Sequence, residues 1–207
     1  MMQIGVLALQ GAFAEHIRSF ARLEVSAREV RLPSHLKGLS GLVIPGGEST
    51  TISHLLDDYA LFEPVKAMVD GGIPVWGTCA GLILLARRTT DLNWPILSAI
   101  DIAVRRNGIG RQVDSFETDL EVVAFGAPRF RAIFIRSPVI TAAGAAVQPL
   151  ASLDDGTVVA AREGNVLVTS FHPELTEDLR FHRYFVEMAT AAQKESAQKG
   201  SMALTAP

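Results

Sequence analysis

Short apolar runs alternate with helix-like patterns through the first ninety residues. The runs predict strands at residues 4–9, 41–44 and 73–76, and a further strand is expected around 27–32. Apolar positions at helical spacing predict helices over 13–23, from about 51, over 62–69 and over 82–88. Ser49 or Thr50 is expected to cap the helix that begins near Thr51. Strands that alternate with helices indicate a mainly parallel, doubly wound α/β sheet with helices on both faces. Active sites in such sheets favour the C-terminal ends of strands.

The second half of the chain has a different pattern. Its β-type segments lie at residues 101–105, 116–123, 131–135, 158–161 and 166–170, so some antiparallel pairing is expected there. A helical pattern resumes over 179–192. Residues 1–193 are therefore expected to form one domain, and 194–207, which are small and polar, to form a mobile C-terminal tail.

Composition narrows the class of protein. The chain of 207 residues is 48% hydrophobic and 20% charged, with a net charge of -3, as expected of a soluble globular protein. It has no Lys/Arg-rich run, so no nucleic-acid partner is expected. The start has no cationic leader, and its apolar stretch is too short for a membrane span, so we expect no membrane association and a cytoplasmic protein.

The single cysteine, Cys79, lies between glycines where a predicted strand turns into a helix. Gly77 and Gly81 permit a strained turn and close approach of a substrate, and a helix N-terminus favours thiolate over thiol. This setting is typical of a nucleophile elbow. A lone cysteine in a cytosolic protein is more often buried and structural, but these neighbours favour a nucleophile here.

A thiolate nucleophile needs a base, and His172 is the strongest candidate. It follows the strand predicted at 166–170 and lies two residues before Glu174. In an extended segment such residues point to the same side, and Pro173 favours that conformation, so Glu174 is expected to orient His172 towards Cys79. The alternative is that His-Pro-Glu forms only a turn and Glu174 favours the start of the last helix.

The other four histidines lack such a setting. His16, His35, His54 and His182 have no adjacent carboxylate in an organised turn, so they are interpreted as surface or core residues. They also lack metal-ligand spacing, so no metal site is expected.

The loop at residues 45–50, Pro-Gly-Gly-Glu-Ser-Thr, follows another predicted strand. Its glycines, Gly46 and Gly47, permit close approach of backbone N–H groups to an oxyanion, and Ala80 N–H is a candidate second donor. Pro-Gly-Gly alone is usually just a loop.

Together, the Gly-Thr-Cys-Ala-Gly turn, the distal His-Pro-Glu and the Pro-Gly-Gly loop resemble the class I (triad) glutamine amidotransferases. Within that group, residues 4–13, 45–51, 104–117 and 134–138 resemble the glutaminase subunits of pyridoxal 5'-phosphate synthase, the PdxT/SNO family. The resemblance implies a three-layer, flavodoxin-like fold. It also implies a glutaminase in which Cys79 attacks the glutamine amide, His172 protonates the departing ammonia and a glutamyl thioester is hydrolysed.

The resemblance further assigns a substrate site and a partner. The residues implied to contact L-glutamine are Gly47, Glu48, Ser49, Arg106, Ile135 and Arg136. An arginine can clamp a carboxylate bidentately, although both arginines are also compatible with a role in surface solubility. The implied partner is a (β/α)₈-barrel synthase subunit that uses the ammonia to make pyridoxal 5'-phosphate, a cofactor this chain would not itself bind.

Two alternatives stay open at the level of sequence. The triad chemistry is shared with glutaminase subunits of other synthases, such as imidazole glycerol phosphate synthase, although the motif at 105–117 argues against that assignment. A catalytically silent binding or regulatory module could also keep this scaffold, because a fold does not determine a function.

Overall fold

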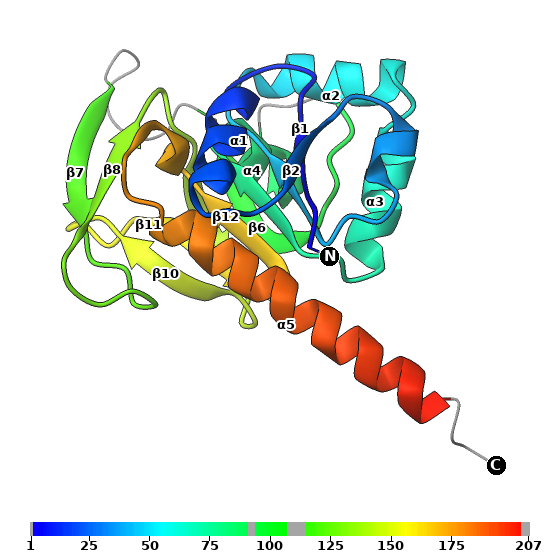
Figure 1. Ribbon diagram of the computed structural model, residues 1–207. Coiled ribbons are helices and arrows are strands. Elements are labelled where there is room, and N and C mark those ends of the chain that lie inside the picture. The colour runs from blue at the N-terminus through cyan, green and yellow to red at the C-terminus, as the bar shows by residue number, and fades with distance from the viewer. Residues whose placement is uncertain (1, 91–93, 107–114, 204–207) are drawn as a thin grey trace.

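The computed structural model of the chain describes residues 2–90, 94–106 and 115–203. At its centre lies a seven-stranded sheet in the order β10-β11-β12-β4-β3-β1-β2 (Figure 1). The bounds are β1 Ile4–Leu7, β2 Ala27–Val30, β3 Gly41–Ile44, β4 Val75–Thr78, β10 Gln148–Ser152, β11 Val158–Glu163 and β12 Val166–Thr169. The five strands from β12 to β2 are parallel, in the order 2-1-3-4 of flavodoxin-like sheets.

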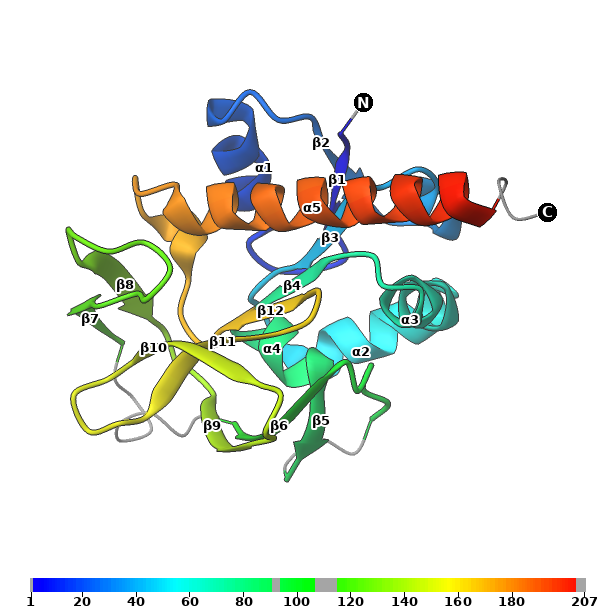
Figure 2. The ribbon, with the colours of Figure 1, turned by 90° about the horizontal axis from the view of Figure 1, so that it is seen from below.

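Helices cover both faces of this sheet, which confirms the predicted three-layer α/β class. One face carries α1 (Phe13–Arg22) and α5 (Arg180–Ala203), and the other carries α2 (Ser49–Asp58), α3 (Phe62–Asp70) and α4 (Ala80–Leu85) (Figure 2). The apolar run of β3 serves both layers: Leu42 and Ile44 pack into the cluster on the α2 side, and Val43 packs into the cluster on the α1 side. Such a run is typical of a parallel strand buried on both faces.

Smaller sheets occupy the second half of the chain. β5 (Ala86–Thr89), β6 (Ile100–Arg105) and β9 (Val139–Ala143) form one, and β7 (Phe116–Leu120) and β8 (Phe130–Phe134) form another. Short 3-10 helices lie at η1 (Pro33–Leu36) and η2 (Pro173–Leu175). The pairs β6–β9, β7–β8, β10–β11 and β11–β12 are antiparallel, which confirms the predicted change of pattern.

The helix predicted over 82–88 is wrong at its C-terminal end. Helix α4 stops at Leu85, and Ala86 adopts an extended conformation (φ -61°, ψ 148°) that opens strand β5. β5 pairs in parallel with β6, and both Arg87 and Arg88 lie 3.3 Å from the carboxylate of Asp101 on that strand. Tertiary pairing therefore overrides the helix-like local pattern.

The predicted cap of α2 is also wrong. The capping residue is Glu48, whose carboxylate accepts a hydrogen bond from Thr51 N–H at 2.8 Å, while Ser49 is already the first helical residue. A carboxylate at a helix N-terminus satisfies a free N–H and interacts favourably with the helix dipole.

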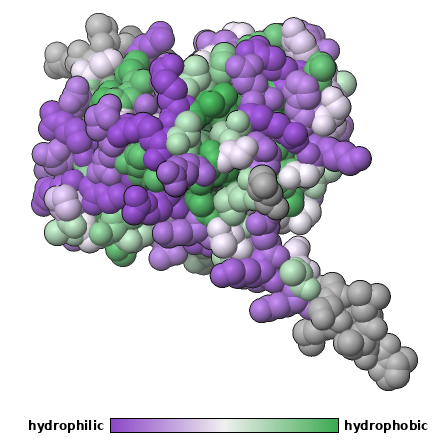
Figure 3. Space-filling view, in the orientation of Figure 1, coloured by the Kyte–Doolittle hydropathy of each residue, from purple (hydrophilic) through white to green (hydrophobic). Residues whose placement is uncertain are grey.

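The last helix extends past the predicted domain end at residue 193. α5 continues without interruption to Ala203, and its projecting part is hydrophilic over the residues shown (Figure 3). The expected mobility of 194–207 stays a prediction, and residues 204–207 lie outside the described part. Residues 107–114, which belong to the motif at 104–117, also lie outside the described part. No helix among the described residues is long and apolar enough to cross a membrane.

Candidate active site

Three segments meet at the C-terminal edge of neighbouring parallel strands. The loop after β3 begins at Pro45, Cys79 follows β4, and the segment after β12 leads to His172. Because β4 pairs with both β3 and β12, these segments are adjacent in space. The sheet therefore assembles residues that are far apart in the sequence.

Cys79 lies on a strained turn between β4 and α4. Its backbone has φ 47° and ψ -101°, a positive φ that a residue with a side chain rarely adopts. The turn is held by a 2.8 Å hydrogen bond from Cys79 N–H to Thr169 O, and it needs a glycine at Gly81 because a Cβ there would overlap the carbonyl oxygen of Ile44. This geometry is typical of a nucleophile elbow.

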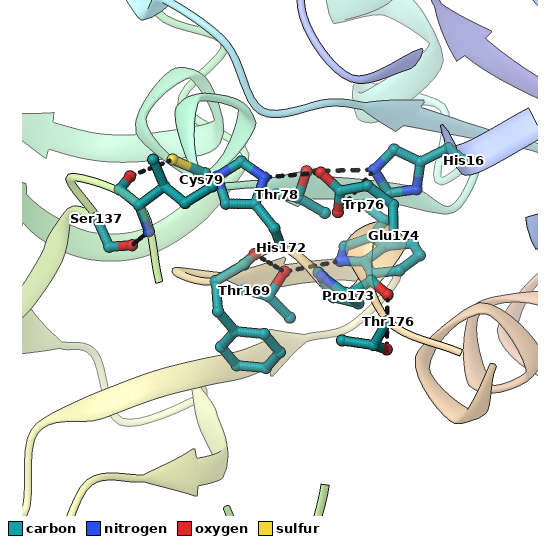
Figure 4. Close-up of polar contacts among 12 residues, drawn as sticks. His16, Trp76, Thr78, Cys79, Ser137, Thr169, His172, Pro173, Glu174 and Thr176 are labelled. Carbon is teal, nitrogen blue, oxygen red and sulfur yellow. Dashed lines mark hydrogen bonds and ion pairs between the residues drawn. The ribbon is translucent and has the colours of Figure 1, made fainter. Parts of the chain in front are cut away.

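His172 is directed by Glu174. His172 Nδ1 lies 2.7 Å from Glu174 Oε1 (Figure 4). The backbone N–H of His172 donates to Ile133 O at 2.9 Å. The prediction that His172 and Glu174 meet within an extended segment is wrong. Strand β12 ends at Thr169, and Glu174 lies in the 3-10 helix η2. The turn itself folds Glu174 back onto the imidazole.

The electrostatic surroundings of His172 favour its protonated form. Burial acts to lower the pKa of His172, but interactions with Cys79 and Glu174 outweigh burial and raise the pKa to about 10. The imidazole therefore carries its proton at neutral pH. An imidazolium next to a cysteine favours the thiolate, which is the nucleophilic form.

A cavity of about 380 Å³ opens in front of these groups. Its lining includes every residue that the sequence assigned to the site except Glu174, which lies behind His172. The predicted residues on the wall are Gly46, Gly47, Glu48, Ser49, Cys79, Ala80, Arg106, Ile135, Arg136 and His172. The volume suits a ligand of amino-acid size.

The Gly46–Gly47 loop is held in place by the segment after β1. Ala12 N–H donates to Gly46 O at 3.0 Å, and Glu48 N–H donates to Gln10 Oε1 at 2.8 Å. A side chain on Gly46 would overlap the imidazole of His172. Gln10 and Ala12 also line the cavity, and sequence reasoning had not assigned either to the site. Their position directly after a parallel strand was the available signal.

Two charged groups lie on one side of the cavity. Arg106 Nη2 is 2.6 Å from Glu48 Oε1, while Glu48 Oε2 caps α2. Burial acts to raise the pKa of Glu48, but hydrogen bonds from Thr51 and the charge of Arg106 outweigh it and lower the pKa. The Ser49 hydroxyl is buried and has no hydrogen-bond partner among the described residues. This side of the cavity therefore carries a cation, an anion and a buried hydroxyl.

His16, interpreted from the sequence as a surface or core histidine, is a core residue, but its contact with Glu174 was not predicted. His16 is fully buried on α1, and its Nε2 lies 3.4 Å from Glu174 Oε2. His16 shares a helix face with Phe13 and Phe20, three residues before and four after it, and this spacing was the readable signal. Among the described residues, no cluster of three or more His, Cys, Asp or Glu side chains has a metal-binding arrangement.

Comparisons with known proteins agree with this geometry. The profile of the SNO glutamine amidotransferase family matches residues 6–191. Pyridoxal 5'-phosphate synthase subunit PdxT of Dehalococcoides mccartyi is 56% identical over 91% of this chain and 97% of its own length, and that of Carboxydothermus hydrogenoformans is 53% identical over 90% and 97%. A crystal structure of a glutamine amidotransferase superposes with a TM-score of 0.86 at 48% identity, covering 90% of this chain and 98% of the other.

Proposed function

Because the chain belongs to the SNO glutamine amidotransferase family, we propose that Cys79, His172 and Glu174 form the catalytic triad of a glutaminase. The enzyme hydrolyses L-glutamine to L-glutamate and ammonia. It is the glutaminase subunit of pyridoxal 5'-phosphate synthase, in keeping with its curated relatives, and it supplies ammonia for vitamin B6 biosynthesis. The contact between His172 Nδ1 and Glu174 Oε1, made beside Cys79, carries the assignment of the triad.

The reaction begins with attack of the Cys79 thiolate on the side-chain amide carbon of glutamine. A C–S bond forms, and the carbonyl electron pair moves to oxygen. The N–H of Ala80 is available to this oxyanion because Ala80 is the first residue of α4, where N–H groups lack intrahelical partners. The Gly46–Gly47 loop supplies the second donor from across the cavity.

Collapse of this intermediate breaks the C–N bond. His172 gives its Nε2 proton to the departing nitrogen, so ammonia leaves and a glutamyl thioester remains on Cys79. His172 is then neutral and accepts a proton from a water molecule, whose oxygen attacks the thioester carbon. The C–S bond breaks, glutamate is released, and the Cys79 thiolate and the His172 imidazolium are restored. Glu174 holds Nδ1 throughout and stabilises the imidazolium, as the acid of a triad does.

Substrate orientation is assigned to the opposite side of the cavity. Arg106 binds the α-carboxylate and Glu48 the α-ammonium group, while Ser49 and the Ile135–Arg136 segment contact the remaining polar atoms. Support comes from the shared position of these residues on the cavity wall and from the charges of Arg106 and Glu48.

The partner is a separate synthase subunit with a (β/α)₈ barrel, which receives the ammonia and condenses it with sugar phosphates. Docking of that subunit adjusts the Gly46–Gly47 loop and completes the oxyanion site, so hydrolysis by the isolated chain is weak. The complex acts in the cytoplasm. Support for a loop that responds to docking comes from its two hydrogen bonds with the neighbouring segment: Ala12 N–H donates to Gly46 O, and Gln10 Oε1 accepts from Glu48 N–H.

The test is glutamate formation by the purified chain, with and without the synthase subunit of pyridoxal 5'-phosphate synthase. We expect weak hydrolysis alone and a clear increase with the partner. Absence of glutamate in both conditions, from folded protein, would refute the glutaminase assignment. Stimulation only by a different synthase would redirect the partner assignment and leave the chemistry intact.

A further inference from the structure

One oxygen of the catalytic carboxylate has no regular hydrogen bond. Glu174 Oε1 binds His172, but Oε2 is buried and makes no hydrogen bond with any described residue. A buried carboxylate oxygen without a donor is costly, so a nearby N–H group is expected to serve it. His16 Nε2, at 3.4 Å, lies within ion-pair distance of this oxygen (Figure 4).

Both ring nitrogens of His16, and the ring itself, contact neighbouring side chains. Its Nε2 is 3.3 Å from Thr78 Oγ1, next to Cys79, and its Nδ1 is 3.0 Å from His182 Nε2. Its ring lies edge-on to Trp76, with centroids 5.3 Å apart and an interplanar angle of 80°. His16 therefore links the strand that carries the nucleophile with the acid that directs the base.

Both buried imidazoles are neutral at physiological pH. Burial lowers the pKa of His16 well below its ordinary value, and the neighbouring imidazoles of His182 and His172 lower it further. Burial lowers the pKa of His182 to about 3, with a further contribution from Arg22. A neutral imidazole has one N–H donor and one acceptor nitrogen, so the contact between the two rings requires defined tautomers.

The unpaired atoms decide between the two possible arrangements. If His16 Nδ1 carried the proton, the Nε2 lone pair would face the negative Glu174 Oε2, and His182 Nδ1–H would be a buried donor without a described partner. If His182 Nε2–H donates to His16 Nδ1, then His16 Nε2–H is the donor in the 3.3 Å hydrogen bond to Thr78 Oγ1 and lies at ion-pair distance, 3.4 Å, from Glu174 Oε2. Electrostatics favour the second arrangement.

We propose that His16, held in one tautomer by His182, is a positioning residue that directs the carboxylate of Glu174 towards His172. This role rests on the proposed glutaminase function of the triad. A neutral donor suits it, because it orients the carboxylate without cancelling the negative charge that stabilises the His172 imidazolium. His16 is absent from the cavity wall, so it acts through Glu174 and not on the substrate.

The activity test uses two replacements at this position in the complex with the synthase subunit. His16→Phe keeps a ring but removes the N–H, and it is expected to lower kcat about 10- to 100-fold, the usual effect of losing a partner behind a catalytic group, with KM nearly unchanged. His16→Gln places an amide N–H near the lost Nε2–H and is expected to recover most of kcat. Ile17→Ala is the matched control, because it removes a partly buried side chain beside His16 without altering the contact with Glu174.

A pH profile separates positioning from simple loss of packing. The groups that raise the pKa of His172 are Cys79 and Glu174, so a misdirected carboxylate lowers that pKa. The alkaline limb of kcat/KM is therefore expected to move to lower pH in His16→Phe and to stay in place in Ile17→Ala. A kcat of His16→Phe within twofold of wild type, or an equal loss in His16→Gln with an unmoved alkaline limb, would overturn the proposal.

The tautomers can be tested independently of activity. Two-bond ¹H–¹⁵N correlation spectra of the full chain are expected to show neutral His16 and His182 rings, each protonated at Nε2. Protonation of His16 at Nδ1 would overturn the proposal even if the wild-type enzyme is fully active. Conversely, a wild-type chain that releases no glutamate but shows the expected tautomers would refute the proposed function and leave the hydrogen-bonded arrangement standing.

Discussion

The two sides of the His172–Glu174 pair are built differently. In front, the cavity is open and carries charged and flexible groups such as Arg106 and Glu48, which are exposed or half-buried. Behind, the carboxylate of Glu174 lies 3.4 Å from the fully buried, neutral His16, which in turn contacts the buried, neutral His182. The open cavity suits a substrate that binds and dissociates, whereas the buried side holds the carboxylate of Glu174 in one orientation. Burial suits only the second of these tasks.

Removing the nucleophile tests the front side most severely. Cys79→Ala is expected to lower glutamine hydrolysis by about 10⁴-fold or more, because no thioester can form. Glutamate release in the complex measures the loss, and a pull-down with the synthase subunit checks that docking survives. Residual hydrolysis near the wild-type rate would show that another group is the nucleophile.

Neutralising the acid between the two sides should have the next largest effect. Glu174→Gln keeps the shape but removes the charge that stabilises the His172 imidazolium, and we expect kcat to fall by up to about 10⁴-fold, by analogy with other triads. The pKa of His172 should also fall from about 10 towards its ordinary value. Titration of the His172 ring by NMR measures the shift, and an unchanged pKa would contradict the assigned role of Glu174.

A change at the substrate end should affect binding more than chemistry. Arg106→Ala removes a charged partner of the α-carboxylate, and a charge-assisted hydrogen bond of about 1.5–3 kcal/mol corresponds to a rise in KM of about 10- to 100-fold. Steady-state kinetics should show a much smaller change in kcat. Arg136→Ala is the paired variant on the same wall. If Arg106→Ala reduced kcat and left KM unchanged, Arg106 would not bind the ground-state substrate.

The buried imidazole of His182, behind Glu174, should make the free energy of unfolding depend on pH. Because the pKa of folded His182 is about 3 and its ordinary value is 6.5, the folded state disfavours the proton that the unfolded chain accepts. The contribution of His182 to stability is therefore largest above pH 6.5 and falls as the pH drops towards 3, by on the order of a few kcal/mol. Urea unfolding of wild type and His182→Phe between pH 7 and 4 measures this difference, and parallel curves would contradict a buried neutral His182.

The same contrast explains how far the sequence could predict the site. Cys79, His172 and the Gly46–Gly47 loop follow predicted parallel strands, and the strand ends alone place them at one edge. The contact of His16 with Glu174 joins a helix near the start of the chain to a turn near its end. No local pattern encodes that contact, although the helical spacing of His16 from Phe13 and Phe20 is compatible with a buried position.

Some strands of the fold also depend on distant contacts and could not be predicted from the local sequence. Most of the parallel strands were predicted from short apolar runs, whereas β5, β9 and β10 were not predicted. The residues of β5, Ala-Arg-Arg-Thr, follow the helix-like segment that begins at Leu82, and only pairing with β6 decides their state. β10 contains Pro149 at the edge of the sheet, where a strand can tolerate a missing N–H. Pairing partners, rather than local propensity, specified these elements.

The central claim is that Cys79 forms a covalent intermediate with glutamine, and trapping that intermediate tests it most directly. The complex is mixed with isotope-labelled glutamine, quenched in acid during turnover, digested and analysed by mass spectrometry. The account predicts a labelled glutamyl thioester on the peptide that contains Cys79, and none in Cys79→Ala. Label on a different residue, or rapid turnover without any label on Cys79, would contradict it.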